Sequence, residues 1–423
     1  MSIAARPLTE HIKSNGEAIG MEEYLLLGGY QSLQKIAKMA PQDVTQLIQD
    51  AGLLGRGGAG FSTGFKMSVV PMGEKAPSTK YLICNADEME PGTFKDRLLL
   101  EHHPHQLIEG MLVSAYAIQA NVAYIFVRGE YKLAIKRLEK AVQEAYQKSF
   151  CGKHLELYVH ASAGRYICGE ETALINALEG KRATPRAKPP FPQSVGAWGK
   201  PTLVNNVETL SNLPHIINHG ADWYHKLSQG TDAGTKIYGV SGRVKKPGAW
   251  ELPMGTTARE LLEVHAGGMQ DGYAFRALLP GGASTDFWLS NQLDTPMDFT
   301  STARMKTRMG TGTMVILDDK TCPVGMILSL EKFFKQESCG WCTPCRDGLS
   351  WVAEILMAFE QGEGQEKDLE QLERHAKLLG PGSTFCALAP GAAAPLSTGL
   401  RYFKEDFYRH ITEKRCPYAH HLH

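Results

Sequence analysis

Three cysteines fall within seven residues near the C-terminus, in the run Cys339-Gly-Trp-Cys342-Thr-Pro-Cys345. Two overlapping C-x-x-C spacings allow one short loop to supply three thiolates to a single metal cluster, with a more distant cysteine as the fourth ligand. A structural zinc site more often takes paired ligands from two separate loops. The spacing therefore favours a [4Fe–4S] cluster over zinc or inert thiols, and it predicts an electron carrier. One upstream cysteine, Cys322, and two downstream cysteines, Cys386 and Cys416, are candidates for the fourth ligand.

A second segment suited to ligand binding is the glycine-rich run Gly55-Arg56-Gly57-Gly58-Ala59-Gly60. It matches G-x-G-x-x-G, but residues 44–53 before it have helical spacing, whereas the dinucleotide fingerprint follows a strand. A turn between two helices is the plain alternative. Four glycines would still let the backbone approach a flat or anionic ligand closely. Arg56 and Lys66 add charge suited to phosphate.

Acidic and amide side chains gather at what we expect to be one edge of a sheet. The run Asn85-Ala86-Asp87-Glu88-Met89-Glu90 follows a predicted strand, and Gly169-Glu170-Glu171 opens a predicted helix. Carboxylates there would accept hydrogen bonds from ribose or ribityl hydroxyls, and Asn205-Asn206 could recognise a polar ring edge. Favourable acids in a helix first turn and an Asx-turn loop are the structural alternatives.

The elements that must position these residues alternate between strand and helix from about residue 80. We expect strands at 81–84, 122–127 and 155–159, and helices at 103–120, 131–146 and 170–179. Nearly continuous apolar strands separated by helices predict a parallel α/β sheet, whose ligands bind beyond the carboxyl ends of the strands. The uncharged run 110–127 is interpreted as helix, turn and strand rather than as a membrane span.

The rest of the chain predicts two further domains. Residues 236–242 and 248–252 indicate a strand pair, and 257–265 a capped helix, which together predict a small α+β module of β-grasp type. Helices are expected at 326–334, 349–359, 368–379 and 400–414. The predicted domains are 1–234 (α/β), 235–322 (β-grasp) and 323–423 (a helical bundle carrying the cluster).

Composition excludes several classes of protein. The 423 residues include 45 basic and 45 acidic side chains, so no overall charge directs the chain to nucleic acid or anionic lipid. Nine cysteines in a long chain argue for a reducing compartment rather than a disulfide framework. Residues 1–16 contain no apolar signal-peptide segment. The terminal run His420-His421-Leu422-His423 could bind metal weakly, but a flexible tail is the expectation.

Several long motifs in series resemble one protein family. They are the glycine-rich loop within residues 52–61, the 83–92 and 166–174 segments, Lys188-Pro189-Pro190-Phe191-Pro192 and the triple-cysteine run. From about residue 20 to 415 the chain is similar to the NADH-binding flavoprotein subunit of bacterial respiratory complex I. The resemblance implies a Rossmann-like parallel-sheet domain for FMN and NADH, and a [4Fe–4S] cluster in the helical domain.

The resemblance also implies the binding residues. For FMN they are Gly55, Arg56, Gly57, Gly58, Lys66, Asn85, Asp87, Glu88, Tyr166, Gly169, Glu170, Glu171, Val204, Asn205, Asn206 and Thr209. For NADH they are Phe61, Lys66, Glu90, Glu171, Lys188 and Phe191. The implied cluster ligands are Cys339, Cys342, Cys345 and Cys386, which leaves the other five cysteines as ordinary thiols.

The implied activity is oxidation of NADH by hydride transfer to FMN, followed by single-electron transfer to the cluster, with no side-chain acid or base. The implied partners are NADH, a thioredoxin-like [2Fe–2S] subunit and the large iron–sulfur subunit of the complex I peripheral arm, on the cytoplasmic side of the bacterial inner membrane. Neither nucleic acid nor membrane insertion is expected. The alternatives are a diaphorase subunit of an NAD-linked hydrogenase or formate dehydrogenase, and a non-catalytic iron–sulfur scaffold.

Overall fold

Four parallel strands form the sheet at the centre of the N-terminal part of this computed structural model, which describes residues 5–419. The terminal histidine run lies outside the described residues. The strands are β1 (Tyr81–Ala86), β2 (Val122–Val127), β3 (Glu156–Ala161) and β4 (Thr202–Asn206), in the order β3-β2-β1-β4. The chain moves from β1 to β2 on one side and later returns to β4 on the other. The carboxyl ends of β1 and β4 therefore flank a topological switch point, where ligands of open α/β sheets bind.

Helices cover both faces of this sheet, as nearly continuous apolar strands predicted. Leu82, Cys84 and Ala86 of β1 pack in the core that includes α6 (Pro104–Ile118), while Ile83 packs toward α8 (Glu171–Leu178). The other helices of this part are α1 (Met21–Leu26), α2 (Gln31–Ile36), α3 (Pro41–Asp50), α4 (Thr63–Ser68), α5 (Lys95–His102), α7 (Lys132–Gln147), α9 (Val207–Ser211), α10 (Leu213–His219) and α11 (Ala221–Lys226).

The uncharged run at 110–127 is helix, turn and strand, as predicted. α6 has 15 residues, nearly all of them buried, and ends at Gln119, which adopts a left-handed conformation before β2 begins. Within residues 5–419 no helix combines the length and the apolar character that crossing a bilayer requires.

A second, mixed sheet follows in the order β6-β5-β8-β7. Its strands are β5 (Thr235–Ser241), β6 (Gly248–Pro253), β7 (Phe275–Leu279) and β8 (Thr313–Asp318). β5 and β6 are the predicted strand pair and lie antiparallel, and β5 lies parallel to β8. The predicted helix begins after Thr257, whose side chain accepts a hydrogen bond from the Glu260 N–H. It comprises α12 (Ala258–Glu260) and a π-helical turn, Leu261–His265; α13 (Phe299–Arg304) follows.

The C-terminal part is helical, with α14 (Pro323–Glu337), α15 (Thr343–Arg346), α16 (Gly348–Glu360), α17 (Glu366–Leu379), α18 (Leu388–Tyr402) and α19 (Lys404–Glu413). The prediction of one helix at 400–414 was wrong. The chain there contains the end of α18 and all of α19, which meet at Phe403. The start of α18 was missed because it is rich in alanine, glycine and proline, which obscure a helical pattern. Small residues let α18 pack closely: a Cβ on Gly399, near the end of the helix, would lie 2.3 Å from Ile327 Cδ1.

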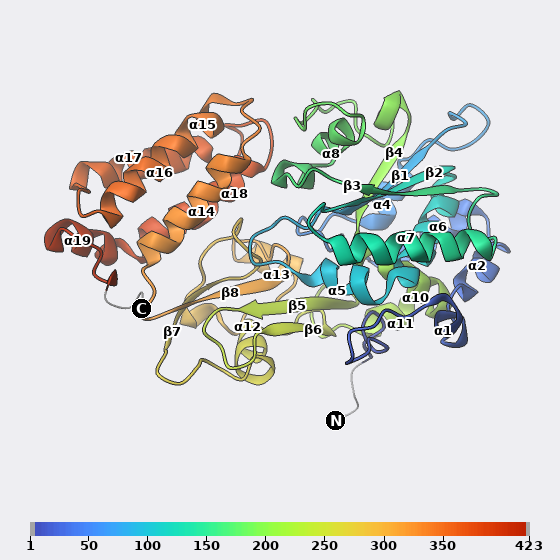
Figure 1. Cartoon of the computed structure of the whole chain (residues 1–423), viewed down its shortest axis with the longest axis horizontal. Coiled ribbons are helices and arrows are strands. Elements are labelled where there is room, and N and C mark those ends of the chain that lie inside the picture. Colours follow the sequence, from blue (N-terminus) through green and yellow to red (C-terminus); the bar gives the residue numbers. More distant parts are fainter. Residues whose placement is uncertain (1–4, 420–423) are drawn as a thin grey trace.

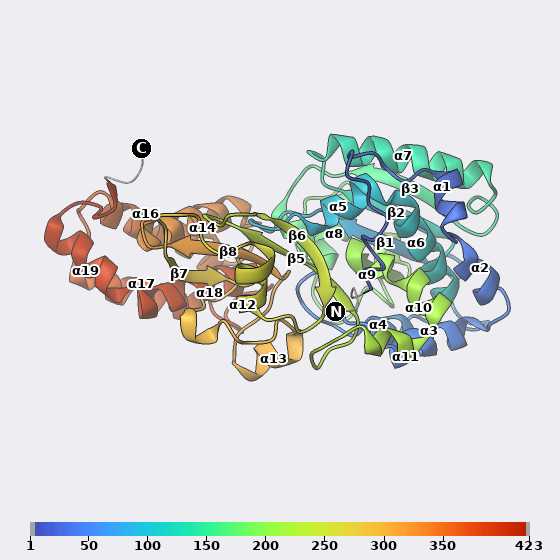
Figure 2. The same cartoon turned by 90° about the horizontal axis from the view of Figure 1, so that it is seen from below.

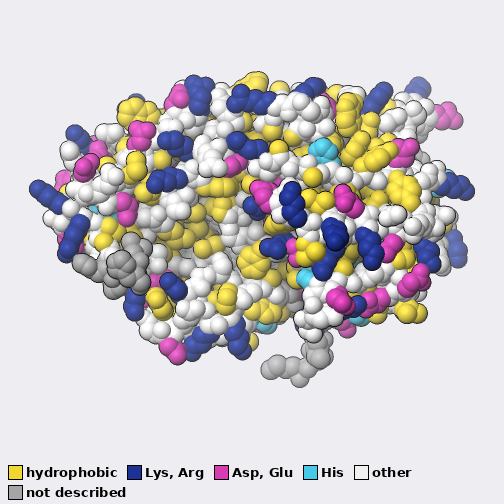
Figure 3. Space-filling view, viewed as in Figure 1, with side chains coloured by type: hydrophobic (Ala, Val, Ile, Leu, Met, Phe, Trp, Pro, Cys, Tyr) yellow, Lys and Arg dark blue, Asp and Glu magenta, His cyan; other side chains and the backbone are white. Residues whose placement is uncertain are grey.

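The three parts adjoin one another (Figures 1 and 2). The α/β part and the helical part lie at opposite ends of the long axis, and the second sheet contacts both. One apolar core contains helical residues of α14 to α19 together with Ala277 and Leu279 of β7, Ala173 of α8 and Ile167 just before α8. Consequently the cysteine loop is held next to the segment that carries Gly169 to Glu171. Acidic and basic side chains are interspersed over the face seen in Figure 3, in keeping with a net charge of zero.

Candidate functional site

A cavity of about 1000 Å³ opens beyond the carboxyl ends of β1 and β4. This volume is at the upper end of the usual range for ligand sites, so the cavity has room for a large cofactor. Asn85 and Asn206 are register partners on these neighbouring strands, so both amides reach the same edge. All but one of the residues predicted to bind FMN or NADH line the cavity: Gly55, Gly57, Gly58, Phe61, Lys66, Asn85, Asp87, Glu88, Glu90, Tyr166, Gly169, Glu170, Glu171, Lys188, Phe191, Val204, Asn205, Asn206 and Thr209.

The glycine-rich loop forms one wall of the cavity. It connects α3 to α4, so a helix precedes it, as the spacing of residues 44–53 predicted. Gly58 and Gly60 have φ of 115° and 65°, which favour glycine. A Cβ on Gly57 would lie 3.3 Å from the Cβ of Asn206, so the loop backbone lies close against the end of β4. A side chain at position 57 would enter the space between the glycine-rich loop and the end of β4.

Two polar atoms on the cavity wall are buried and have no partner within the described residues. They are Oδ2 of Asp87, an acceptor, and Nδ2 of Asn205, a donor. Burial raises the pKa of Asp87 to about 7, although a hydrogen bond from Ser162 opposes that rise. Buried polar groups almost always have a partner. A ligand with both donors and acceptors, such as a flavin with its ribityl chain, fits this pair.

Glu171 is held between two lysines on the cavity wall. Its Oε2 is 2.6 Å from Nζ of Lys66, and its Oε1 is 3.0 Å from Nζ of Lys188. Burial alone would raise the pKa of Glu171, but the two lysines outweigh it and lower the pKa. Glu171 is therefore an ionised carboxylate that neutralises nearby positive charge.

Glu90 connects three segments around the cavity. Tyr166 donates a 2.7 Å hydrogen bond to Oε2, and the Ser284 N–H donates one of 2.6 Å to Oε1. Burial raises the pKa of Glu90, and these hydrogen bonds limit the rise. Because Ser284 belongs to the loop after β7, this carboxylate links the end of β1 to the second sheet.

The four predicted cluster cysteines meet in one small hollow. Its other lining residues are apolar or hydroxyl-bearing, and none of them is a carboxylate or histidine: Pro185, Trp341, Thr384, Phe385 and Ala389. The Phe385 N–H donates to Sγ of Cys342 at 3.2 Å, and Ser338 Oγ lies 3.1 Å from Sγ of Cys345. Hydrogen bonds to sulfur in an apolar setting suit an iron–sulfur cluster. Cys386 lines both this hollow and the large cavity, so the two sites are adjacent.

Comparison with known proteins accounts for both sites. Residues 48–215 match the Nuo51 FMN-binding domain, and residues 325–410 match the iron–sulfur binding region of NADH-ubiquinone oxidoreductase-F. The chain is 54% identical over 95% of its length to the NADH-quinone oxidoreductase F subunit of Escherichia coli K12, covering 92% of that protein. The chain belongs to the F-subunit family of NADH-quinone oxidoreductases. The predicted family and its cofactors, FMN and a [4Fe–4S] cluster, are confirmed.

Other members of the F-subunit family and one solved structure are also similar. The F subunit of Mycobacterium bovis is 44% identical to this chain, and the match covers 92% of this chain and 89% of that protein. A chain of the NAD⁺-reducing [NiFe]-hydrogenase in the H₂-reduced state has a TM-score of 0.82 at 34% identity over 92% of this chain. This chain spans only 65% of that hydrogenase chain. Residues 237–287 match the SLBB domain, which lies within the predicted β-grasp module.

Arg56 is a correction to the predicted site. Its guanidinium does not line the cavity and is fully buried, donating to the hydroxyl of Tyr224 at 3.0 Å and to the carbonyl of Ala233 at 2.8 Å. Only its backbone N–H stays near the cavity wall, donating to Thr209 Oγ1 at 2.8 Å. The expectation that its charge faces a phosphate was therefore wrong. The sequence shows a basic residue in a loop but not which way its side chain turns.

Two predicted acids also have structural tasks. Glu88 accepts hydrogen bonds from the backbone N–H groups of Asp96 and Arg97, at 2.8 and 3.0 Å, and so caps the start of α5. Glu170 is the N-cap of α8, accepting from the N–H groups of Thr172 and Ala173. Glu170 thus has a structural role at the start of the helix as its N-cap, whereas the acid in the first turn is Glu171; Glu88 and Glu170 both still line the cavity.

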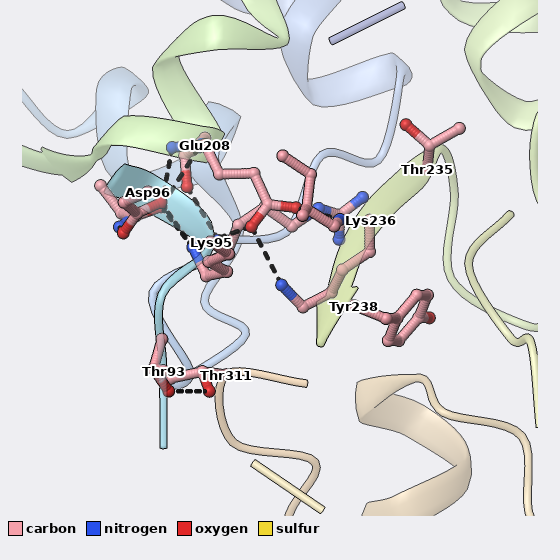
Figure 4. A network of polar contacts seen from close by, with 12 residues as sticks. Thr93, Lys95, Asp96, Glu208, Thr235, Lys236, Tyr238 and Thr311 are labelled. Atoms are coloured by element: carbon pink, nitrogen blue, oxygen red, sulfur yellow. Dashed lines mark hydrogen bonds and ion pairs between the residues drawn. The ribbon is translucent and has the colours of Figure 1, made fainter. Parts of the chain in front are cut away.

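Sequence reasoning missed several wall residues: Thr93, Lys95, Asp96, Gln193, Ser284, Arg308 and Thr311. Lys95 is the centre of a buried network in which its Nζ lies 2.6 Å from Asp96 and 2.8 Å from Glu208 (Figure 4). A Lys-Asp pair shortly after the acidic run was a usable signal. No local sequence signal pointed to Ser284, Arg308 and Thr311, because they lie far along the chain and reach the cavity only through the second sheet.

Proposed function

We propose that the chain oxidises NADH by transferring its hydride to bound FMN and then passes electrons singly to the [4Fe–4S] cluster, as the electron-input subunit of a respiratory NADH:quinone oxidoreductase. The observation that carries the proposal is the position of Cys386, which lines the flavin-sized cavity on one side and the cysteine hollow on the other. Membership of the F-subunit family supports it. FMN supplies the conversion between a two-electron donor and a one-electron acceptor.

We assign the flavin to the inner part of the cavity. The backbone of Gly57 and Gly58 offers a side-chain-free wall, and the unpartnered atoms of Asp87 and Asn205 offer one acceptor and one donor. Asn85 and Asn206 supply further amides at the strand ends. No side chain needs to transfer a proton, because these residues bind and orient the two reactants.

We assign the nucleotide to the outer part. Phe61 and Phe191 line the cavity while each keeps 56% of its surface exposed, which leaves two aromatic faces free to stack on a base or a nicotinamide ring. Lys66 and Lys188 provide positive charge for the nucleotide phosphates, and Glu171 can accept a hydrogen bond from a ribose hydroxyl.

We propose that the function divides along the chain at the domain boundaries expected from the sequence. We assign FMN and NADH binding to residues 1–234, a supporting β-grasp domain to 235–322 and the cluster to 323–423. Hydrogen bonds such as that from Ser284 to Glu90 give the middle domain a role in shaping the cavity.

Family members are named as subunits, so the chain acts within a multi-subunit complex. We propose that its direct partners are the thioredoxin-like [2Fe–2S] subunit and the large iron–sulfur subunit of the peripheral arm, on the cytoplasmic side of the bacterial inner membrane. Beside the cysteines, Trp341 is 60% exposed and packs near the exposed ring of Phe385, with ring centroids 5.8 Å apart. Exposed aromatic groups next to an electron carrier suit a protein interface.

An anaerobic absorbance titration with NADH tests the proposed function. The purified chain should show flavin and iron–sulfur absorbance, and NADH should bleach the flavin. A preparation that retains the cluster but shows no flavin or no bleaching would support the scaffold alternative instead. The diaphorase alternative is less well supported, since the hydrogenase chain is less similar and extends well beyond this one.

A further inference from the structure

Four ligand-type side chains meet at the end of the helical part that lies away from the cysteine hollow. They are Cys322, Glu360, His410 and Cys416, and their ligand atoms all lie within 4.8 Å of one another. Cys322 precedes α14, whereas the hollow follows its last turn. At 1.5 Å per residue, the 15 residues of α14 separate the two places by about 20 Å. This cluster is therefore distinct from the iron–sulfur site.

The distances within the cluster already approach those of a metal site. Sγ of Cys322 is 2.9 Å from Oε1 of Glu360 and 3.5 Å from Nε2 of His410, and those two atoms are 3.1 Å apart. Tetrahedral zinc with bonds of about 2.0–2.3 Å places its ligand atoms about 3.3–3.8 Å from each other. Because Sγ of Cys416 also lies within 4.8 Å of these three atoms, small shifts of the four side chains would complete the tetrahedron.

Neighbouring groups orient the ligand atoms inward. Nδ1 of His410 lies 2.7 Å from the carbonyl oxygen of Asp406, a contact that directs the other ring nitrogen, Nε2, toward the cluster. A histidine held in this way is typical of metal sites. The Gly325 N–H donates to Sγ of Cys322 at 3.3 Å, as backbone groups do to metal thiolates. The side chain of His410 is fully buried, and Cys416 is buried as well.

We propose that Cys322, Glu360, His410 and Cys416 bind one structural Zn²⁺ ion. Zinc accepts sulfur, nitrogen and oxygen ligands together in four-coordinate sites, whereas iron–sulfur clusters draw on thiolates and copper(I) prefers soft ligands. Binding converts both thiols to thiolates and releases their two protons to solvent, with no change of oxidation state. The interpretation of these two cysteines as ordinary thiols is thereby revised.

The site would fasten the helices that carry the cluster loop. Cys322 caps the start of α14 and Glu360 is the last residue of α16, and the cysteine loop runs between the other ends of these two helices. His410 belongs to α19, and Cys416 follows it. One ion would thus join α14, α16 and the C-terminal segment, and it would hold α14 and α16 together at their far ends.

Metal analysis of the full-length chain tests the proposal. The wild type should contain about one zinc per chain in addition to cluster iron, and His410→Ala or Cys416→Ser should each lower zinc to below about one tenth while iron and flavin persist. Cys151→Ser, at a buried cysteine outside both clusters, should keep its zinc. A variant with His420, His421 and His423 changed to Ala should also keep it, which excludes binding by the terminal histidines.

A cobalt titration covers the case in which the variants fail to fold. Wild-type chain from which zinc has been removed by a chelator should bind one Co²⁺, with thiolate-to-cobalt charge transfer and the strong visible bands of a tetrahedral site. Absence of zinc together with absence of these bands would overturn the proposal. Zinc that persists in both variants, zinc lost only with the terminal histidines, or a Cys322–Cys416 disulfide seen by mass spectrometry would overturn it too.

Discussion

Lys66 of α4 and Glu171 of α8 form an ion pair of 2.6 Å on the wall of the cavity. The pair joins two helices that lie 105 residues apart in sequence, and a second lysine, Lys188, occupies the other oxygen of the same carboxylate at 3.0 Å. Lys188 also pairs with Glu170, at 2.9 Å, so two carboxylates balance two lysines here. The balance of charge around Glu171 should therefore affect whether the cavity binds a nucleotide with an additional phosphate group.

Glu171→Ala should admit NADPH. A carboxylate here accepts a hydrogen bond from the ribose 2′-hydroxyl of NADH and repels the 2′-phosphate of NADPH. Its removal also frees Lys66 to attract that phosphate, while Lys188 keeps its ion pair with Glu170. We expect kcat/KM for NADPH to rise at least tenfold, which corresponds to about 1.4 kcal/mol. Steady-state kinetics with an artificial electron acceptor and both nucleotides measures this directly.

The matched control is Glu90→Gln. Glu90 also lines the cavity, but its hydrogen bonds from Tyr166 and the Ser284 N–H tie it to the second sheet, and among the described residues it has no lysine partner that its loss would free. Loss of its charge should change NADH turnover without admitting NADPH. If Glu171→Ala still excludes NADPH, a different group sets nucleotide choice.

Gly57→Val should lose flavin. The Cβ alone would lie 3.3 Å from the Cβ of Asn206, and two further methyl groups would enter the space between the loop and the strand end. Flavin content after purification, measured from released FMN, should fall severalfold. Gly20→Val is the control, because a Cβ at this glycine meets no heavy atom within 4 Å and the residue lies outside the cavity wall. Full flavin in Gly57→Val would make the loop a structural turn.

The sequence predicted the sheet and its ligand-binding edge because both depend on local patterns. Apolar strands and intervening helices indicate a parallel sheet, and a parallel register necessarily brings Asn85 and Asn206 to the same edge. The fourth cluster ligand could not be chosen from spacing. Cys322, Cys386 and Cys416 were equally eligible, and only the resemblance favoured Cys386.

What the sequence could not predict depends on side-chain direction and on contacts between distant segments. Arg56 turns toward Tyr224, 168 residues away, instead of toward the cavity. Ser284 reaches Glu90 only because the second sheet packs against the first. Likewise, Cys322 and His410 meet across 88 residues, through the packing of α14 against α19. No local sequence pattern predicts such contacts between residues that lie far apart in the chain.

Glu208→Gln should destabilise the junction between the two sheets. Glu208 is fully buried between Lys95, at 2.8 Å, and Lys236, at 3.0 Å (Figure 4). Removing the shared carboxylate leaves the buried ammonium group of Lys236 without its acidic partner and leaves Lys95 paired with Asp96, at a cost of about 3–5 kcal/mol. The thermal midpoint of the purified chain should fall by several degrees. Glu263→Gln, which breaks an exposed pair with Arg259, should change it little.

Lowering the pH should remove the stabilisation that the ionised carboxylate of Glu208 contributes. Burial alone would raise the pKa of Glu208, but Lys236 and Lys95 outweigh it and lower the pKa from 4.5 to about 2. A lowered acid pKa stabilises the fold above the unfolded value, and this contribution is lost as the pH falls from 4.5 toward 2. The difference in thermal midpoint between wild type and Glu208→Gln should therefore hold between pH 7 and 5 and shrink below 4.5. A constant difference would show that Glu208 is not ionised in the fold.

Cys386→Ser should abolish the paramagnetic signal of the reduced cluster while flavin stays bound. Cys386 faces the hollow formed with Cys339, Cys342 and Cys345, so its loss removes one of four thiolates. The flavin wall is built mainly from the glycine loop and the ends of β1 and β4, which the substitution leaves intact.

Electron paramagnetic resonance of the dithionite-reduced chain, together with flavin and iron content, checks this prediction. Cys416→Ser is the matched control, because Cys416 lies in the other cluster of ligand-type side chains, about one helix length away. It should keep the signal and lose only zinc. If Cys416→Ser abolishes the signal and Cys386→Ser preserves it, Cys386 is not the fourth ligand. Its place between cavity and hollow would then be that of a packing residue, and the proposed route from flavin to cluster would need a different neighbour.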